Sequence, residues 1–165
     1  MIKPKQLPST ILSLLNERLK DEYYAFYLYR YLGNCLQNMG YKLAAKHFHE
    51  ESEEELCHAK KIEQFIISWN EEPTLPAIKL DCDCEGIPDA VEHAYKTEYE
   101  LYEKYEETSV NVMDKGDVCV FDFLQYFRDI QVKSVAYYAD LINMLEGVNS
   151  KDKVSILLME QKLFG

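Results

Sequence analysis

Four long stretches of this chain carry apolar residues at alternating spacings of three and four, which predicts four helices that pack together. Each apolar seam is interrupted by ionisable or polar residues. These are Glu22 in the first stretch, Glu55 and His58 in the second, Glu98 in the third and Gln131 in the fourth. A carboxylate buried in a helical core is strongly destabilising unless something compensates it. Because no Lys or Arg interrupts these seams, the pattern indicates a bound multivalent cation.

The composition narrows the class of protein. A length of 165 residues predicts one domain, spanning residues 1–165, that is large enough to bury a substantial core. The net charge of −11 argues against nucleic acid or an anionic membrane as a partner, and it suits cations. No stretch is long enough to span a bilayer, and residues 1–10 lack the apolar segment of a secretory signal.

The cysteines give a prediction about the compartment. There are 5 of them, an odd set, and those at positions 35, 57 and 119 lie inside predicted helices. This argues against a disulfide framework and predicts a reducing, cytoplasmic environment. Cys82 and Cys84 form a Cys-x-Cys pair without the second pair that a closed zinc site requires. We therefore predict two loop thiols, with soft-metal binding as the alternative.

Turn-forming residues bound the predicted helices. The first helix is expected to have Ser9 or Thr10 as its N-cap, and a short turn at 38–40 makes the second helix its antiparallel neighbour. Pro and Gly exclude a helix over 71–88, and this segment is long enough to return along the bundle. The predicted fold class is therefore all-α, a four-helix bundle of two hairpins joined by a long crossover, plus a fifth helix. The first two helices end near residues 37 and 70, and the others span about 89–115, 118–146 and 151–163, so that the bundle covers about 9–146.

The segment from Glu55 to His58 is the most specific local motif. A spacing of three residues puts both side chains on one helix face, where one metal ion can take an oxygen and a nitrogen together. Taken alone, this spacing is common, and a surface pair is the usual interpretation. Its position on an apolar seam, opposite polar residues on three other helices, favours a metal site. Carboxylates with imidazole suit iron or manganese better than copper or zinc.

Tyrosines and charged runs on the same helices have simpler interpretations. Tyr29 lies two turns after Glu22, and this spacing favours a hydrogen-bonded core tyrosine. The third seam is predicted to bury Tyr95, Tyr102 and Tyr105. The acidic run over 50–54 is typical of a solvated helix face. The remaining histidines have no partner at ligand spacing and are predicted to lie on the surface: His47, His49 and His93.

Together these motifs resemble those of non-haem ferritins over essentially the whole chain. The resemblance implies the ferritin-like form of the four-helix bundle. It also implies that Glu22, Glu55 and His58 hold a first iron. Glu55 and Glu98 would share a second iron beside Gln131, and Tyr29 would be an electron donor next to this centre. The matching segments are Glu22-Tyr23 followed by Tyr29, Glu54-Glu55-Leu56-Cys57-His58, Tyr95-Lys96-Thr97-Glu98 and Gln131-Val132-Lys133.

The same resemblance implies an activity and an assembly. Two Fe(II) ions per subunit would be oxidised by O2 or H2O2, and the Fe(III) would be stored as a hydrated oxide. Twenty-four identical subunits would form a hollow shell with the fifth helix at its four-fold axes. Haem is not expected, because Leu56 stands where bacterioferritin has a haem-binding Met. Four residues of the fifth helix are expected to be buried against neighbouring subunits: Ile156, Leu157, Met159 and Leu163.

Two alternatives predict different sequences. A rubrerythrin-like di-iron redox enzyme would carry a second Glu-x-x-His motif and usually a rubredoxin-like Cys-x-x-Cys pair. Here Gln131 is followed by Ser134 at that spacing, and no Cys-x-x-Cys occurs. A cage subunit without catalysis would have apolar or basic residues at the ligand positions, and the sequence has neither. Iron storage with ferroxidase activity is therefore the function that the sequence favours.

Overall fold

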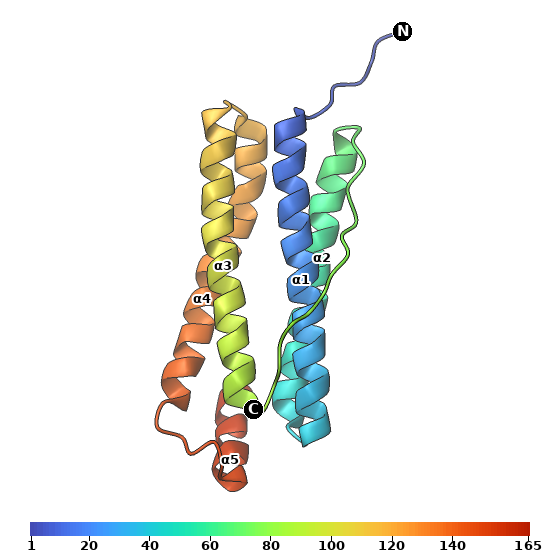
Figure 1. The fold of residues 1–165 in the computed structure, drawn as a ribbon. Helices are drawn as coiled ribbons and strands as arrows, with labels where there is room; N and C mark the ends of the chain where they lie inside the picture. Colours follow the sequence, from blue (N-terminus) through green and yellow to red (C-terminus); the bar gives the residue numbers. More distant parts are fainter.

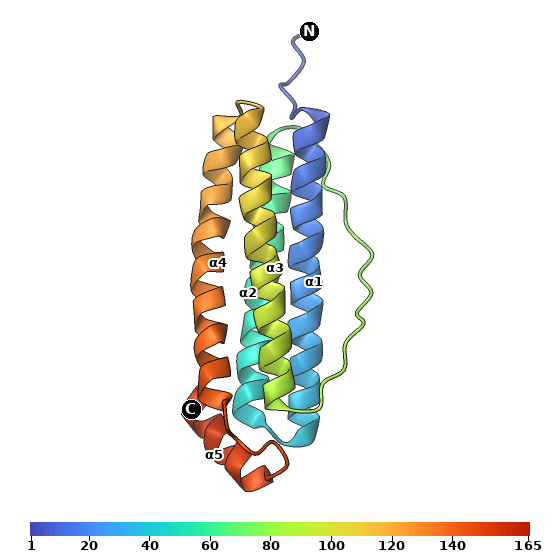
Figure 2. The same ribbon diagram turned by 60° about the vertical axis from the view of Figure 1, so that its left-hand side comes forward.

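The computed structural model describes residues 1–165 and contains five α-helices and no strand. The helices α1 and α2 form one antiparallel hairpin, and α3 and α4 form a second that lies beside it (Figure 1). The segment 69–86 runs back along the length of the bundle to join the two hairpins (Figure 2). The predicted all-α bundle is therefore confirmed. Its elements are α1 (Ser9–Met39), α2 (Lys42–Ser68), α3 (Ile87–Asp114), α4 (Val118–Leu145) and α5 (Lys153–Phe164).

The ends of α1 follow from local chain chemistry. The residue before the helix is Pro8, and neither Ser9 nor Thr10 supplies the predicted side-chain cap. At the other end, Gly40 has a φ of 90°, a left-handed conformation that glycine adopts without steric cost. The backbone N–H groups of Gly40 and Tyr41 donate to carbonyls of the last turn of α1. This compact ending produces the sharp reversal into α2.

A hydrogen bond links the crossover segment to α1. The backbone N–H of Thr74 donates to Oδ1 of Asn16 at 2.8 Å. No disulfide is present, and the two loop cysteines differ in exposure, since Cys82 is half-buried and Cys84 is buried. The Cys84 thiol donates to the carbonyl of Gly86 at 3.7 Å. The predicted loop thiols therefore lie in the crossover, but Cys84 also belongs to the core.

The short helix α5 closes one end of the bundle. Glu160 is 5% exposed, and its carboxylate accepts hydrogen bonds from the N–H groups of Leu43 and Ala44 at 2.8 and 3.0 Å. A carboxylate in this position satisfies free N–H groups of α2 and complements the positive end of its helix dipole. Ile156 is buried within its own chain, so the prediction that it is buried against another subunit is wrong.

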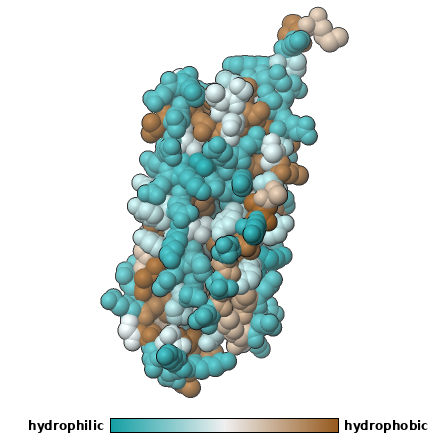
Figure 3. All heavy atoms as spheres, viewed as in Figure 1, coloured by the Kyte–Doolittle hydropathy of each residue, from teal (hydrophilic) through white to brown (hydrophobic).

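The buried face of α3 differs from the predicted seam. Ala94 and Leu101 are buried, as is Tyr105, whereas Tyr95 and Tyr102 are only half-buried. The phenol hydroxyl explains this difference, because a tyrosine with no buried hydrogen-bond partner keeps its polar end near water. The face drawn in Figure 3 is largely hydrophilic, with apolar side chains in separate patches. None of the five helices combines the length and apolar composition that crossing a bilayer demands.

Candidate metal centre

The polar residues of the first two seams meet inside the bundle. The ligand atoms of Glu22 from α1 and of Glu55 and His58 from α2 all lie within 4.8 Å of one another. Nδ1 of His58 is 3.1 Å from Oε2 of Glu55 and 3.5 Å from Oε2 of Glu22. All three residues are buried, and neither carboxylate forms an ion pair with Lys or Arg. The predicted cluster without a Lys or Arg partner is therefore present.

The second hairpin brings Glu98 from α3 and Gln131 from α4 together. Both are buried, with 0% and 1% of their surface exposed. In the amide orientation that satisfies both groups, Nε2 of Gln131 donates to Oε2 of Glu98 at 2.8 Å and to its carbonyl at 3.1 Å. Gln131 therefore fixes the direction of the Glu98 carboxylate. Residues that hydrogen-bond to a metal ligand commonly orient it in this way.

Two buried tyrosines donate hydrogen bonds to these carboxylates. Tyr29 of α1 donates to Oε1 of Glu98, and Tyr105 of α3 donates to Oε1 of Glu22. Burial and the neighbouring carboxylates raise the pKa of both phenols well above its usual value. The sequence places Tyr29 at this position but does not indicate a site role for Tyr105. Its spacing of seven residues from Glu98, equal to that between Glu22 and Tyr29, was the available signal.

The four ionisable residues influence one another's pKa values. Burial and repulsion by Glu22 raise the pKa of Glu55 well above its usual value. Burial alone would lower the pKa of His58, but the adjacent carboxylates of Glu22 and Glu55 raise that pKa to about 11. Burial raises the pKa of Glu98 to about 7, although the bond from Tyr29 opposes this. For Glu22, burial is outweighed by the neighbouring His58 and by the hydrogen bond from Tyr105, so its pKa is lowered. Near neutral pH, His58 therefore carries a proton.

One atom of the cluster has no hydrogen-bond partner. Oε2 of Glu22 is buried and accepts no hydrogen bond. An unsatisfied buried acceptor costs about 1–3 kcal/mol, and more when it is charged. This oxygen faces the ligand atoms of Glu55 and His58. A divalent cation among the three groups would satisfy it, and two carboxylates with an imidazole are a donor set that suits iron or manganese. The residues present therefore fit a transition-metal ion.

The other histidines lie outside this cluster. His47 is half-buried, with its ring beside those of Phe48 and Phe164, so the prediction that it lies on the surface is wrong. His49 packs against Gly33, where an added Cβ would lie 2.4 Å from the imidazole ring. A larger residue at this position would force the imidazole of His49 to move. The ring of His93 is half-buried too, and it contacts a backbone carbonyl of the crossover at 2.9 Å.

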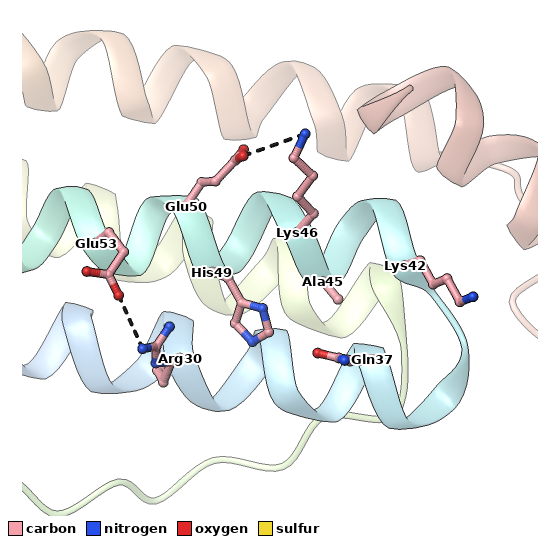
Figure 4. Close-up of a pocket in the computed structure, with 8 residues that line it drawn as sticks. All are labelled: Arg30, Gln37, Lys42, Ala45, Lys46, His49, Glu50 and Glu53. Carbon is pink, nitrogen blue, oxygen red and sulfur yellow. Dashed lines mark ion pairs between the residues drawn. The ribbon is translucent and has the colours of Figure 1, made fainter.

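A groove of about 490 Å³ lies on the surface between α1 and α2 (Figure 4). Charged residues line it, and one ion pair joins the two helices across it, between Arg30 and Glu53 at 3.2 Å. A second pair, between Lys46 and Glu50 at 3.7 Å, runs along α2. Both pairs are exposed, and such pairs contribute little to stability. Most of the acidic run is solvated as predicted. Glu51 is the exception, because it is half-buried and burial raises its pKa to about 7.

Comparison with known proteins relates this chain to ferritins along most of its length. The bacterial non-heme ferritin of Staphylococcus epidermidis is 25% identical over 158 residues, which cover 95% of each chain. A probable bacterial non-heme ferritin-like protein of Haemophilus influenzae is 20% identical over 153 residues, covering 92% of this chain and 93% of the relative.

Solved structures show the same fold. A humanized archaeal ferritin has a TM-score of 0.88 and 26% identity, over 96% of both chains. An open pore ferritin from Archaeoglobus fulgidus has the same TM-score at 24% identity, over 96% of this chain and 98% of that one. The family model of the ferritin-like domain matches residues 12–148. This chain therefore belongs to the ferritin-like domain family.

Proposed function

We propose that this protein is an iron-storage ferritin whose subunit oxidises Fe(II) at two adjacent positions in its bundle. The family and the fold support iron storage of the ferritin kind. The observation that carries the ferroxidase activity is the buried cluster of Glu22, Glu55 and His58, in which one carboxylate oxygen has no hydrogen-bond partner. Such an arrangement is destabilising without a cation and becomes satisfied when one binds.

Each residue has a distinct part in the proposed reaction. A first Fe(II) binds Glu22, Glu55 and His58, and a second binds Glu55 and Glu98. Each iron gives one electron to O2 or H2O2. Gln131 orients Glu98 through its amide. Tyr29 can supply a further electron, because its hydroxyl donates a hydrogen bond to Glu98 and so lies beside the second iron position. A neutral amide attracts a hard cation less than a carboxylate does, so the second iron binds more weakly and leaves after oxidation.

Storage further requires a cavity, and we propose that twenty-four subunits enclose one. The isolated chain exposes three apolar residues of α5, with Val154, Leu157 and Leu158 at 65%, 40% and 70%. Exposed apolar surface on a short helix is typical of a protein contact. The cytoplasm is the proposed compartment, because its reducing environment preserves Fe(II) and the free thiols.

Iron oxidation and assembly can be tested on the same sample. Aerobic addition of two Fe(II) per subunit should give a rapid absorbance change, followed by slower growth of ferric oxide. On size-exclusion chromatography, the protein should elute as a particle of about twenty-four subunits, and this fraction should stain for iron. Rapid oxidation by a monomer or dimer would support the proposed ferroxidase activity and contradict the proposed shell. A large particle without rapid oxidation would favour a cage subunit without catalysis.

Metal binding should release protons, because the ligands must lose them first. His58 has its pKa raised to about 11, so it is protonated at pH 7. We expect the first metal ion to displace this proton, so that its affinity falls about 10-fold per pH unit below pH 7. Calorimetry with anaerobic Fe(II), in buffers of different ionisation enthalpy, counts the protons released.

The variant His58→Gln is the matched test of this count. It removes one displaceable proton, so the release should fall by about one and the pH dependence should become shallower. The wild type could instead bind Fe(II) without proton release. That result would show that the cluster is already deprotonated, and it would contradict the assigned protonation states.

A further inference from the structure

Three tyrosines of this chain are completely buried, and one of them does not contact the metal cluster through its hydroxyl. Tyr29, Tyr105 and Tyr138 each have 0% of their surface exposed. Tyr29 donates to Glu98, and Tyr105 donates to Glu22. The hydroxyl of Tyr138, on α4, instead lies 3.2 Å from Nε2 of His47, on α2. Tyr138 is therefore a buried phenol whose partner is an imidazole outside the cluster.

Ring contacts connect Tyr138 to the cluster in one direction and to the surface in the other. Its ring is stacked with that of Tyr29 at a centroid distance of 6.3 Å and an interplanar angle of 28°. On the other side, the ring of Tyr137 lies 5.1 Å away, and Tyr137 is 39% exposed. Both distances fall in the range of direct aromatic contact. Three oxidisable rings therefore form an unbroken path from Glu98 to solvent.

His47 is suited to accept a proton. Rings of Phe48, Phe164 and Tyr137 lie 5.2, 4.9 and 5.5 Å from its own ring. This burial lowers its pKa to about 4, although the nearby Glu50 opposes the shift. The imidazole is therefore neutral at physiological pH. In the tautomer with its proton on Nδ1, the free Nε2 accepts the hydrogen bond of the phenol.

A second group also faces Tyr138. The Glu51 carboxyl of α2 lies near its hydroxyl, and burial raises the pKa of Glu51 to about 7. Glu51 is therefore partly ionised near neutral pH and is a rival acceptor, but the hydrogen bond of the Tyr138 hydroxyl is to His47, at 3.2 Å. The identity of the proton acceptor, His47 or Glu51, matters because a phenol loses its proton when it loses an electron. A base held at hydrogen-bond distance makes that loss easier.

We propose that Tyr138 is a second redox-active tyrosine, which reduces an oxidised Tyr29 while its own phenol proton moves to His47. The proposal rests on the proposed ferroxidase function, in which O2 is the oxidant. When Tyr29 gives an electron to partly reduced O2, its proton passes to Glu98. One electron then moves from Tyr138 to Tyr29, and Tyr29 regains its proton from Glu98. His47 becomes a cation and Tyr138 a neutral phenoxyl radical, so charge and protons balance.

The same path restores the resting state. One electron from a further Fe(II) reduces the phenoxyl of Tyr138, either through Tyr29 or through the exposed Tyr137, and His47 returns the proton. Each phenoxyl reduced in this way converts one Fe(II) to Fe(III). The iron pair gives O2 two electrons and Tyr29 a third. Once Tyr138 has reduced Tyr29, Tyr29 can give the fourth electron that reduction to two waters requires, and two later Fe(II) then return both tyrosines to their resting state. Tyr138 thereby makes complete reduction possible without a second iron pair.

Freeze-quench EPR tests the proposal directly. Protein loaded anaerobically with two Fe(II) per subunit is mixed with O2 and frozen at increasing times. In the wild type we expect an early phenoxyl signal from Tyr29 that gives way to a longer-lived one from Tyr138. High-field EPR should show that the later radical accepts a hydrogen bond. Tyr138→Phe preserves the ring volume and should eliminate the later radical while the first phase of iron oxidation remains.

Three further variants separate redox transfer from structural effects. His47→Gln should slow the appearance of the later radical by on the order of 10²-fold and remove its hydrogen-bond signature. Glu51→Gln should leave that signature in place. Tyr95→Phe, a half-buried tyrosine of α3 whose hydroxyl forms no hydrogen bond, should match the wild type. Circular dichroism and size-exclusion chromatography verify that each variant is folded and assembled.

The outcomes of this experiment are distinct. An unchanged later radical in folded Tyr138→Phe, with rapid iron oxidation intact, would overturn the role of Tyr138 and leave the proposed function standing. Loss of the hydrogen-bond signature in Glu51→Gln, together with its persistence in His47→Gln, would overturn the role of His47. Failure of the wild type to oxidise Fe(II) rapidly would instead remove the proposed function on which this inference depends.

Discussion

Replacing Glu55 with Gln should eliminate the rapid phase of Fe(II) oxidation, with a loss on the order of 10²-fold or more in initial rate. Substitutions of groups that merely orient metal ligands commonly cost 10–100-fold in affinity or activity, so loss of a shared ligand should exceed this. Glu55 lies with Glu22 and His58 on one side, and it is the proposed bridge toward Glu98 on the other. An amide keeps the side-chain volume but removes the charge required by both iron positions.

The neighbouring residue provides a matched control. Glu54 lies one position earlier on α2 and is exposed, so Glu54→Gln makes the same chemical change outside the cluster. Stopped-flow absorbance at two Fe(II) per subunit should show the rapid phase in Glu54→Gln and the wild type alone. Equal rapid oxidation in all three proteins, each folded and assembled, would refute the assignment of Glu55.

The second large effect concerns stability, and we expect it from Asp21→Ala. The guanidinium of Arg18 is mostly buried and forms an ion pair with Asp21 at 2.7 Å. It also donates to the carbonyl of Lys104 at 2.9 Å and to the hydroxyl of Thr108, both on α3. This network joins the two hairpins. Removal of Asp21 leaves a buried cation without its carboxylate, which should cost about 3 kcal/mol.

Thermal unfolding measures this loss. For a chain of this length, 3 kcal/mol corresponds to a fall in Tm of about 6–12 °C. Lys104→Ala is the control, because its ammonium also contacts Asp21, at 2.8 Å, but is 42% exposed. It should cost about 1 kcal/mol or less. All samples need the same protein concentration, since assembly shifts the apparent stability. Equal Tm values for Asp21→Ala and Lys104→Ala would show that burial of Arg18 does not determine the effect.

The helices and the central cluster could be predicted because both depend on periodicity along single helices. Glu22, Glu55 and Glu98 lie on apolar seams, and a seam determines which face is buried. The same reasoning missed Arg18 and Arg128. Each is buried beside a seam, where the partner comes from another helix. Both arginines donate to hydroxyls of α3. The contact of Arg18 depends on how the two hairpins pack against each other, and that of Arg128 on how α3 and α4 pack within one hairpin.

Contacts between distant elements could not be predicted from the sequence, because they too depend on how the helices pack. Nothing local to His47 indicates that it meets Tyr138, because residues of α2, α4 and α5 surround it only in the folded bundle. Glu160 is a similar case, because its partners are backbone groups at the start of α2. Spacing could have indicated Tyr105, whereas the partners of His47 and Glu160 required the three-dimensional arrangement.

The most direct test of a paired iron site is anomalous diffraction at the iron edge, from crystals soaked anaerobically in Fe(II). We predict two peaks per subunit, one among Glu22, Glu55 and His58, and one between Glu55 and Glu98. Under limiting iron the second peak should have the lower occupancy, and Gln131→Glu should raise it, because a carboxylate attracts the cation more strongly than an amide does. The absence of iron from this cluster, or a single peak at saturating Fe(II), would contradict the paired site on which the proposed ferroxidase depends.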